Sequence, residues 1–198
     1  MTGLRVSGQG SDRGLTLIEL IITVALTTMV ITVTGTILVS ALKVQAGVGA
    51  LGSASNGAQL VARSLQRGIG NASAIKAEVP TADGQLLRAR VAVAGAGGAV
   101  AWQCVAWYWS ATARTVRTTS SPTGAVAAPT AATLPSWSLL AHQVQLPSGS
   151  TQPFTTAGTQ LQLRLTVGGA SATRPILVAT TVAAGPQSDS STAPTTCF

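Results

Sequence analysis

Side chains that could carry out acid–base or metal chemistry are scarce in this sequence of 198 residues. It has one histidine, His142, and five acidic residues, of which Glu78, Asp83 and Asp189 follow the apolar N-terminal segment. A catalytic triad or a metal site needs several such groups at suitable spacing, and these residues do not supply them. We therefore expect no enzymatic activity and no metal or cofactor, with His142 a packed or surface residue rather than a general base.

The two cysteines, Cys104 and Cys197, allow two interpretations. They are too few for a zinc site, and neither lies in a C-x-x-C pair. A disulfide between them would stabilise the fold by roughly 4 to 5 kcal/mol in the chain-entropy model, and it would require an oxidising compartment. Alternatively, Cys104 is a buried thiol inside an apolar run and Cys197 a loose one near the C-terminus.

The charge pattern argues against a nucleic-acid-binding protein. The formal charge is +7, but charged residues make up only 9% of the chain, and small hydroxylated and apolar residues dominate. This composition is not typical of a cytosolic surface. A phosphate-binding face requires clustered cations, and we expect no specific nucleic-acid binding because the arginines are scattered. Those that follow the apolar N-terminal segment lie at Arg63 and Arg67, Arg88 and Arg90, Arg114 and Arg117, Arg164 and Arg174.

Four aromatic residues crowd one strand-like segment: Trp102, Trp107, Tyr108 and Trp109. An exposed stack of this kind would suggest binding of a carbohydrate or a base. A small domain with few aromatic residues also needs large side chains to fill its core, and alternate residues such as Trp107 and Trp109 would point inward. Core packing is the interpretation we adopt.

An uninterrupted apolar run of 28 residues extends from Leu15 to Leu42 and holds one ionisable side chain, Glu19. As a helix it would be roughly 42 Å long, enough to cross the hydrocarbon layer of a membrane. Arg13 precedes the run and Lys43 follows it. The short basic leader is more easily retained in the cytoplasm than the remainder is, which predicts an N-in, C-out orientation.

Glu19 is the informative residue, because an unpaired carboxylate inside an apolar span is costly and suggests a function. The surrounding stretch R-G-L-T-L-I-E-L, at residues 13–20, resembles the cleavage and methylation motif of type IV prepilins. The family more often has Phe where this chain has Leu15. The resemblance implies that a membrane-embedded prepilin peptidase cuts between Gly14 and Leu15 and methylates the new amino group of Leu15.

The same resemblance implies an assembly role for Glu19, which would pair with the N-terminal amine of a neighbouring subunit and so offset the desolvation of both charges. The implied partners are the prepilin peptidase, other pilins or pseudopilins, an inner-membrane assembly platform and, before assembly, membrane lipid. The implied location is a single-pass cytoplasmic membrane protein that becomes part of an extracytoplasmic filament. The strand order looks similar to larger minor pilins and to J-type pseudopilins of type II secretion.

The predicted fold class is α+β, with a long N-terminal helix packed against an antiparallel β-sheet in the manner of type IV pilins. The expected parts are a leader at 1–14, a transmembrane or filament-core helix at 15–42, an amphipathic continuation at 43–72 and a β-rich head at 73–198. Glycines and an asparagine predict that the helix ends near residue 70. Arg63 and Arg67, one turn apart, are expected to be solvated, a filament contact or an anionic partner being the alternative.

Short runs rich in Val, Leu, Trp and Thr predict the strands of the head. The run from Leu161 to Val167 alternates cleanly, so Leu161, Leu163, Leu165 and Val167 should face the helix. Segments 120–135 and 185–198 are expected to be surface loops, the latter pinned at Cys197 in the disulfide interpretation. The expected strands are 85–94, 100–110, 114–119, 137–146, 160–167 and 175–183.

Three classes of function remain open from the sequence. The first is a filament subunit, which serves adhesion, motility, DNA uptake or secretion with the same N-terminal device. The second is a signal-anchored extracytoplasmic binding domain in which Glu19 is incidental and reaches the headgroups. The third, an extracytoplasmic enzyme, lacks the necessary residues.

Overall fold

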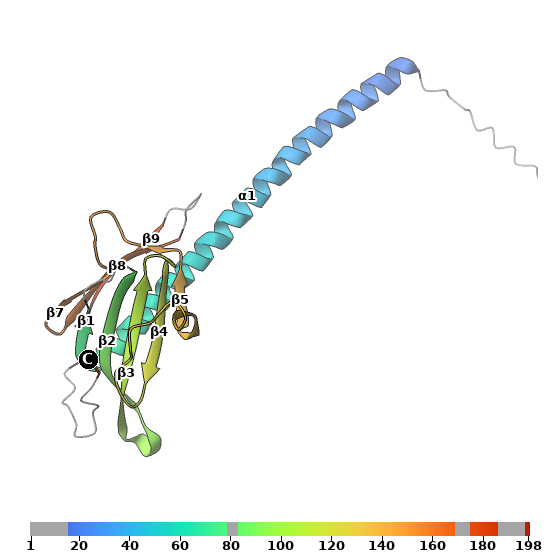
Figure 1. Ribbon diagram of the computed structural model, residues 1–198. Coiled ribbons are helices and arrows are strands. Elements are labelled where there is room, and N and C mark those ends of the chain that lie inside the picture. The colour runs from blue at the N-terminus through green and yellow to red at the C-terminus, as the bar shows by residue number, and fades with distance from the viewer. Residues whose placement is uncertain (1–15, 79–82, 169–174, 186–196) are drawn as a thin grey trace, which may run out of the picture. The chain divides into compact units, whose positions relative to one another are not determined.

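A computed structural model describes residues 16–78, 83–168, 175–185 and 197–198. The chain divides into two compact units, an N-terminal unit (Met1–Ala46) and a head unit (Gly47–Phe198). One helix, α1 (Leu17–Gly70), contributes to both. The fold is α+β, as predicted, with the last turns of α1 packed against antiparallel sheets (Figure 1).

Helix α1 begins at a recognisable cap and ends at the predicted position. The Glu19 backbone N–H points to the Thr16 hydroxyl oxygen at 3.4 Å, and the Leu20 N–H donates to the Thr16 carbonyl oxygen at 3.1 Å. Thr16 and Glu19 thus occupy the first and last positions of a T-x-x-E capping pattern. The helix is unbroken through its glycine-rich stretch and ends at Gly70, which confirms the prediction.

The first sheet of the head unit is a five-stranded antiparallel meander in the order β1-β2-β3-β4-β5. Its longest pair, β2 with β3, keeps one register from Gly84 opposite Ser110 to Ala94 opposite Val100. The hairpin that joins them contains a short 3-10 turn, η1 (Ala96–Gly98). The strands are β1 (Ala72–Ala77), β2 (Gly84–Ala94), β3 (Val100–Ser110), β4 (Thr115–Ser121) and β5 (Ser138–His142).

The second sheet is built around β8, which pairs with β6 and β7 on one side and with β9 on the other. All pairings are antiparallel. A further 3-10 turn, η2 (Leu134–Ser136), precedes β5. The strands are β6 (Val144–Gln145), β7 (Phe154–Ala157), β8 (Gln160–Val167) and β9 (Ile176–Ala183).

One predicted strand was wrong in its extent. The run 137–146 is two strands, β5 and β6, which belong to different sheets. Gln143, between them, has a positive φ of 55°, so the chain turns there instead of continuing extended. Strands β1 and β7 were absent from the predicted set, because each is short and carries little apolar alternation.

The main core lies between α1 and both sheets. Val61, Leu65 and Ile69 of the helix are completely buried and pack in one cluster with the inner faces of the strands. Leu161, Leu163, Leu165 and Val167 are at most 1% exposed and join this cluster, whereas Gln162 and Arg164 are exposed, which confirms the predicted alternation.

Small residues of the helix allow the close approach. A Cβ atom on Gly57 would lie 3.2 Å from the Cβ atom of Ala141, and one on Gly68 would lie 2.5 Å from the Trp107 ring. The Trp107 indole N–H donates to the Ser64 hydroxyl at 2.9 Å. Trp107 therefore rests on a helix turn that only glycine leaves open.

A buried glutamine joins the two sheets. The Gln85 side-chain amide donates to the Phe154 carbonyl oxygen at 2.9 Å, and the Phe154 backbone N–H donates to the Gln85 side-chain oxygen at 3.0 Å. Both groups are buried, and a paired buried amide avoids the desolvation cost of an unpaired one. The side chain of Gln85 thus joins β2 of the first sheet to the backbone of β7 in the second sheet.

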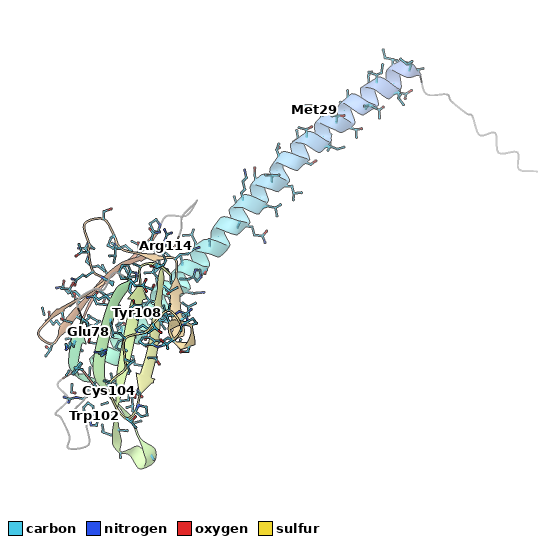
Figure 2. All side chains as sticks on the ribbon, viewed as in Figure 1. Met29, Glu78, Trp102, Cys104, Tyr108 and Arg114 are labelled. Carbon is cyan, nitrogen blue, oxygen red and sulfur yellow. A yellow bond between two sulfur atoms is a disulfide. The ribbon has the colours of Figure 1, made fainter. Side chains whose placement is uncertain are left out.

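A second, smaller core covers the opposite face of the first sheet. It contains Leu86, Ala106, Tyr108, Val126 and Trp137 around the disulfide between Cys104 and Cys197. The Cα atoms of the two cysteines are 5.5 Å apart, and Tyr108 meets Trp137 edge to face with ring centroids 6.4 Å apart. Figure 2 labels Cys104 and Tyr108 on this sheet.

This second core corrects part of the loop prediction. Segment 120–135 is mostly exposed, but Ser120 and Ser121 belong to β4, and Val126 is buried against Trp137. Of the other predicted loop, 185–198, residues 186–196 lie outside the described residues, and Cys197 is fully buried in its disulfide. Of the aromatic residues of β3, Trp107 and Trp109 belong to the main core and Tyr108 to the second core.

Candidate functional site

The first candidate site is the N-terminal portion of α1, whose side chains from Thr16 to Ala46 are all exposed. Within the described residues, α1 is the helix long and apolar enough to span a membrane. This is a candidate membrane anchor. Its exposed large side chains include Leu17, Ile18, Ile21, Leu26, Met29, Ile31, Ile37 and Leu42.

Threonine hydroxyls in this segment are satisfied within the helix. Thr23 donates to the Glu19 carbonyl oxygen, Thr27 to that of Thr23 and Thr28 to that of Val24, each at 2.7 Å. Such back-bonding hides the polar groups of Ser and Thr from an apolar surrounding. The segment therefore presents an apolar surface despite its threonines.

Glu19 lies in the first turn of α1 and is the one ionisable side chain between Thr16 and Leu42. Its carboxylate is exposed and makes no ion pair within the part of the chain that the structure describes. A carboxylate in the first turn also interacts favourably with the helix dipole. The predicted cleavage and methylation positions, Gly14 and Leu15, lie outside the described residues.

The second candidate site is a groove of about 570 Å³ in the head unit between α1 and the first sheet. Val91, Val93, Val105 and Trp107 of β2 and β3 contribute apolar lining, and Leu60, Arg63, Ser64 and Arg67 line the helix side. Neither exposed arginine makes an ion pair or side-chain hydrogen bond to the described residues. The groove combines an apolar surface with two cations, which suits an anionic group carried on an apolar body.

A smaller, polar pocket of about 410 Å³ lies over the exposed face of β7 and β8. Its lining residues offer hydroxyls, amides and one guanidinium, but no acidic side chain and no aromatic platform. This set could hydrogen-bond a small polar molecule but offers no acid–base pair. The lining residues are Gly149, Ser150, Thr151, Gln152, Thr155, Gln162 and Arg164.

His142 forms a contact that the sequence did not indicate. Its Nε2 atom lies 3.2 Å from the Ser53 hydroxyl oxygen, so the pair links β5 to α1. Both residues are exposed, and no carboxylate within the described residues forms an ion pair with the imidazole. A nucleophilic serine needs a histidine that a third group orients and donors that stabilise the oxyanion. The Ser53–His142 contact therefore links the helix to the sheet.

The two remaining chemical predictions concern the cysteines and the aromatic cluster. Cys104 and Cys197 are joined and buried, as the disulfide interpretation held. Trp107 and Trp109 point into the main core, and Trp102 and Tyr108 are also buried, so these rings do not form an exposed stack. Among the described residues there is no group of three or more His, Cys, Asp or Glu side chains that could hold a metal ion.

Comparison of the chain with protein-family models, with curated proteins and with solved structures finds no match.

Proposed function

We propose that this chain is a prepilin-like structural subunit, cut between Gly14 and Leu15 and assembled into a filament through α1. One observation carries the proposal. An exposed apolar helix holds a single carboxylate, Glu19, four residues after the proposed new terminus, and the same helix continues into a head in which it packs on antiparallel sheets. A filament subunit needs both parts.

The proposed assembly step follows from charge. Cleavage converts the amide of Leu15 into a positive amine, four residues before Glu19 in the sequence. In an apolar surrounding each charge is costly alone. The amine of one subunit and the carboxylate of its neighbour would satisfy each other, and the exposed apolar side chains of α1 would exchange lipid for neighbouring helices.

The head unit carries whatever distinguishes this subunit. The disulfide supports placing the head in an oxidising compartment, hence outside the cytoplasm with the N-terminus inside. Its size and loop content support a minor pilin or pseudopilin rather than a major subunit. We propose no enzymatic activity and no specific nucleic-acid binding, and as partners the prepilin peptidase, other pilins, the assembly platform and membrane lipid before assembly.

Mass spectrometry of the mature protein tests the cleavage. The full chain is produced together with a prepilin peptidase, and its terminal peptide is sequenced. We expect an N-methylated Leu15, and we expect the Gly14→Val variant to keep its leader. An intact terminus at Met1 in the parent chain, or a cut after residue 42, would favour the signal-anchored binding domain instead.

Two matched variants separate assembly from helix capping. Glu19→Gln keeps the size of the side chain and removes its charge, so we expect membrane insertion to persist. Incorporation into filaments should fall at least about tenfold, which corresponds to a loss of roughly 1.4 kcal/mol or more of pairing free energy. Thr16→Val removes only the hydroxyl cap and should leave incorporation close to that of the parent. Normal incorporation of Glu19→Gln contradicts the charge-pairing step.

A further inference from the structure

The outer strands of the two sheets differ in how well their edges are protected. Strand β1 has a register shift between Ala72 and Ala74 and carries Lys76, and β5 is short with a register shift at its pairing with β4. Bulges, lysines and short length are the usual devices that keep an edge from pairing with another chain. Strand β9 has none of them.

Strand β9 pairs with β8 over eight consecutive residue pairs without a register shift, from Ile176 opposite Val167 to Ala183 opposite Gln160. Its sequence, ILVATTVA, contains no charge, no proline and no glycine. Within the described residues no strand pairs with its outer edge. An eight-residue neutral edge of this kind is a template for another strand.

The hydrogen-bond pattern identifies the groups on that edge. The Arg164 N–H donates to the Pro153 carbonyl oxygen, on the β7 side, and successive N–H groups of a strand alternate in direction, so Leu163 and Leu165 face β9. Their partners are Thr180 and Val178. The Ala184 N–H donates to the Thr159 carbonyl oxygen, which fits the same alternation. The backbone groups directed away from β8 therefore belong to Leu177, Ala179, Thr181 and Ala183.

We infer that β9 pairs with the β9 strand of a second copy of this chain, antiparallel, so that the second sheet continues across two copies. The four outward residues lie symmetrically about Thr180. Leu177 would face Ala183 of the second copy, Ala179 would face Thr181, and Thr180 would face Thr180. Every outward N–H then meets a carbonyl oxygen.

A second copy fits this edge for a reason of charge. Self-pairing places each residue near its own equivalent, and like charges directly opposite each other are destabilising. Strand β9 has no charged residue, so its self-pairing carries no such penalty. A two-fold arrangement also closes after two copies, which stops further growth at this edge. The inference requires neither cleavage at Gly14 nor a filament.

Cysteine crosslinking of the full chain in detergent micelles tests the pairing. Thr180 and its equivalent would occupy a non-hydrogen-bonded position with Cα atoms about 4.5 Å apart, which a disulfide can bridge. The described cysteines are already joined and at most 1% exposed, so they offer no competing thiol. We expect Thr180→Cys to give a disulfide-linked dimer on mild oxidation.

Two control variants make the crosslink specific. Thr181→Cys lies one residue away but opposite Ala179, and Thr155→Cys lies exposed on β7. We expect about tenfold less dimer from either, because their thiols cannot reach their own equivalents. Equal crosslinking of all three variants would indicate random collision and would overturn the inference, as would no crosslink from Thr180→Cys.

Amide hydrogen exchange provides a second readout. The amides of Leu177, Ala179 and Thr181 should exchange fast in dilute protein and become protected as its concentration rises. Ala179→Pro removes one outward N–H and no bond to β8, so the head should stay folded while concentration-dependent protection is lost. Protection that is already complete at high dilution would mean that the chain covers its own edge. Protection that appears only with a different protein would identify another partner, and either result overturns the second-copy inference.

Discussion

The middle and the C-terminal part of α1 use the same apolar periodicity in opposite ways. Val44, Val48 and Leu51 are exposed, whereas Val61 and Leu65, which continue the same apolar pattern, are completely buried against the sheets. Hydrophobicity alone does not distinguish these two parts of the helix. The difference lies in what these residues face. Val61 and Leu65 face the strands of the head. In our proposal, the exposed residues face lipid or other subunits.

Glycine shows the same contrast at finer detail. Apart from the adjoining helix backbone, a Cβ atom on Gly47, Gly49 or Gly52 would meet none of the described residues within 4 Å, whereas one on Gly57 or Gly68 would contact the sheets. In the open stretch glycine only weakens the helix. At the sheets it provides the space that the packing needs.

The largest expected effect comes from truncating matched leucines in the middle and the C-terminal part of α1. Leu65→Ala should lower the free energy of unfolding of the head by about 2 to 5 kcal/mol, because it leaves a cavity in a fully buried site. Leu38→Ala, where the side chain is 61% exposed, should leave it unchanged. Guanidinium unfolding in detergent, followed by tryptophan fluorescence, measures both. Equal losses would contradict the division of the helix.

A pair of glycine substitutions should give effects of opposite sign. Gly68→Ala places a methyl group against the Trp107 ring and should destabilise the head by about 1 to 3 kcal/mol. Gly52→Ala enters open space and should stabilise the helix by up to about 1 kcal/mol. The same unfolding measurement compares them, and a stabilising Gly68→Ala would show that Trp107 is free to move aside.

The smallest effect concerns the helix start. Thr16→Val removes the hydroxyl that faces the Glu19 N–H, so the first turn should fray at a local cost of about 0.5 to 2 kcal/mol. Amide exchange at Glu19 should accelerate while the head's unfolding curve stays the same. A changed unfolding curve of the head would show that the effect of this substitution is not confined to the first turn.

Local patterns predicted much of this fold. The end of α1 follows from its glycines and Asn71, and β8 follows from strict alternation of leucines with polar residues. Both signals lie within a few residues. The break at Gln143 and the pairing of short β7 depend on residues far away in sequence, and alternation alone does not show them.

The candidate sites also differ in whether a local sequence signal or contacts between distant residues reveal them. Glu19 is conspicuous in the sequence because everything around it is apolar, and its T-x-x-E cap could also have been recognised there. The groove beside Arg63 and Arg67 brings together helix residues and strand residues that are far apart in the sequence, which only packing can show. Its apolar lining, and the Ser53–His142 contact, were not foreseen.

The disulfide has a consequence for what a protease can release from the head. Cys104 and Cys197 are 93 positions apart, and their bond closes β4 to β9 and most of the exposed loops into one covalent ring. A protease that cleaved a loop inside this ring would nick the backbone without releasing a fragment. After one cut inside the ring, β8 and β9 would stay covalently joined to β3 through the disulfide, and through β2 and β1 to α1.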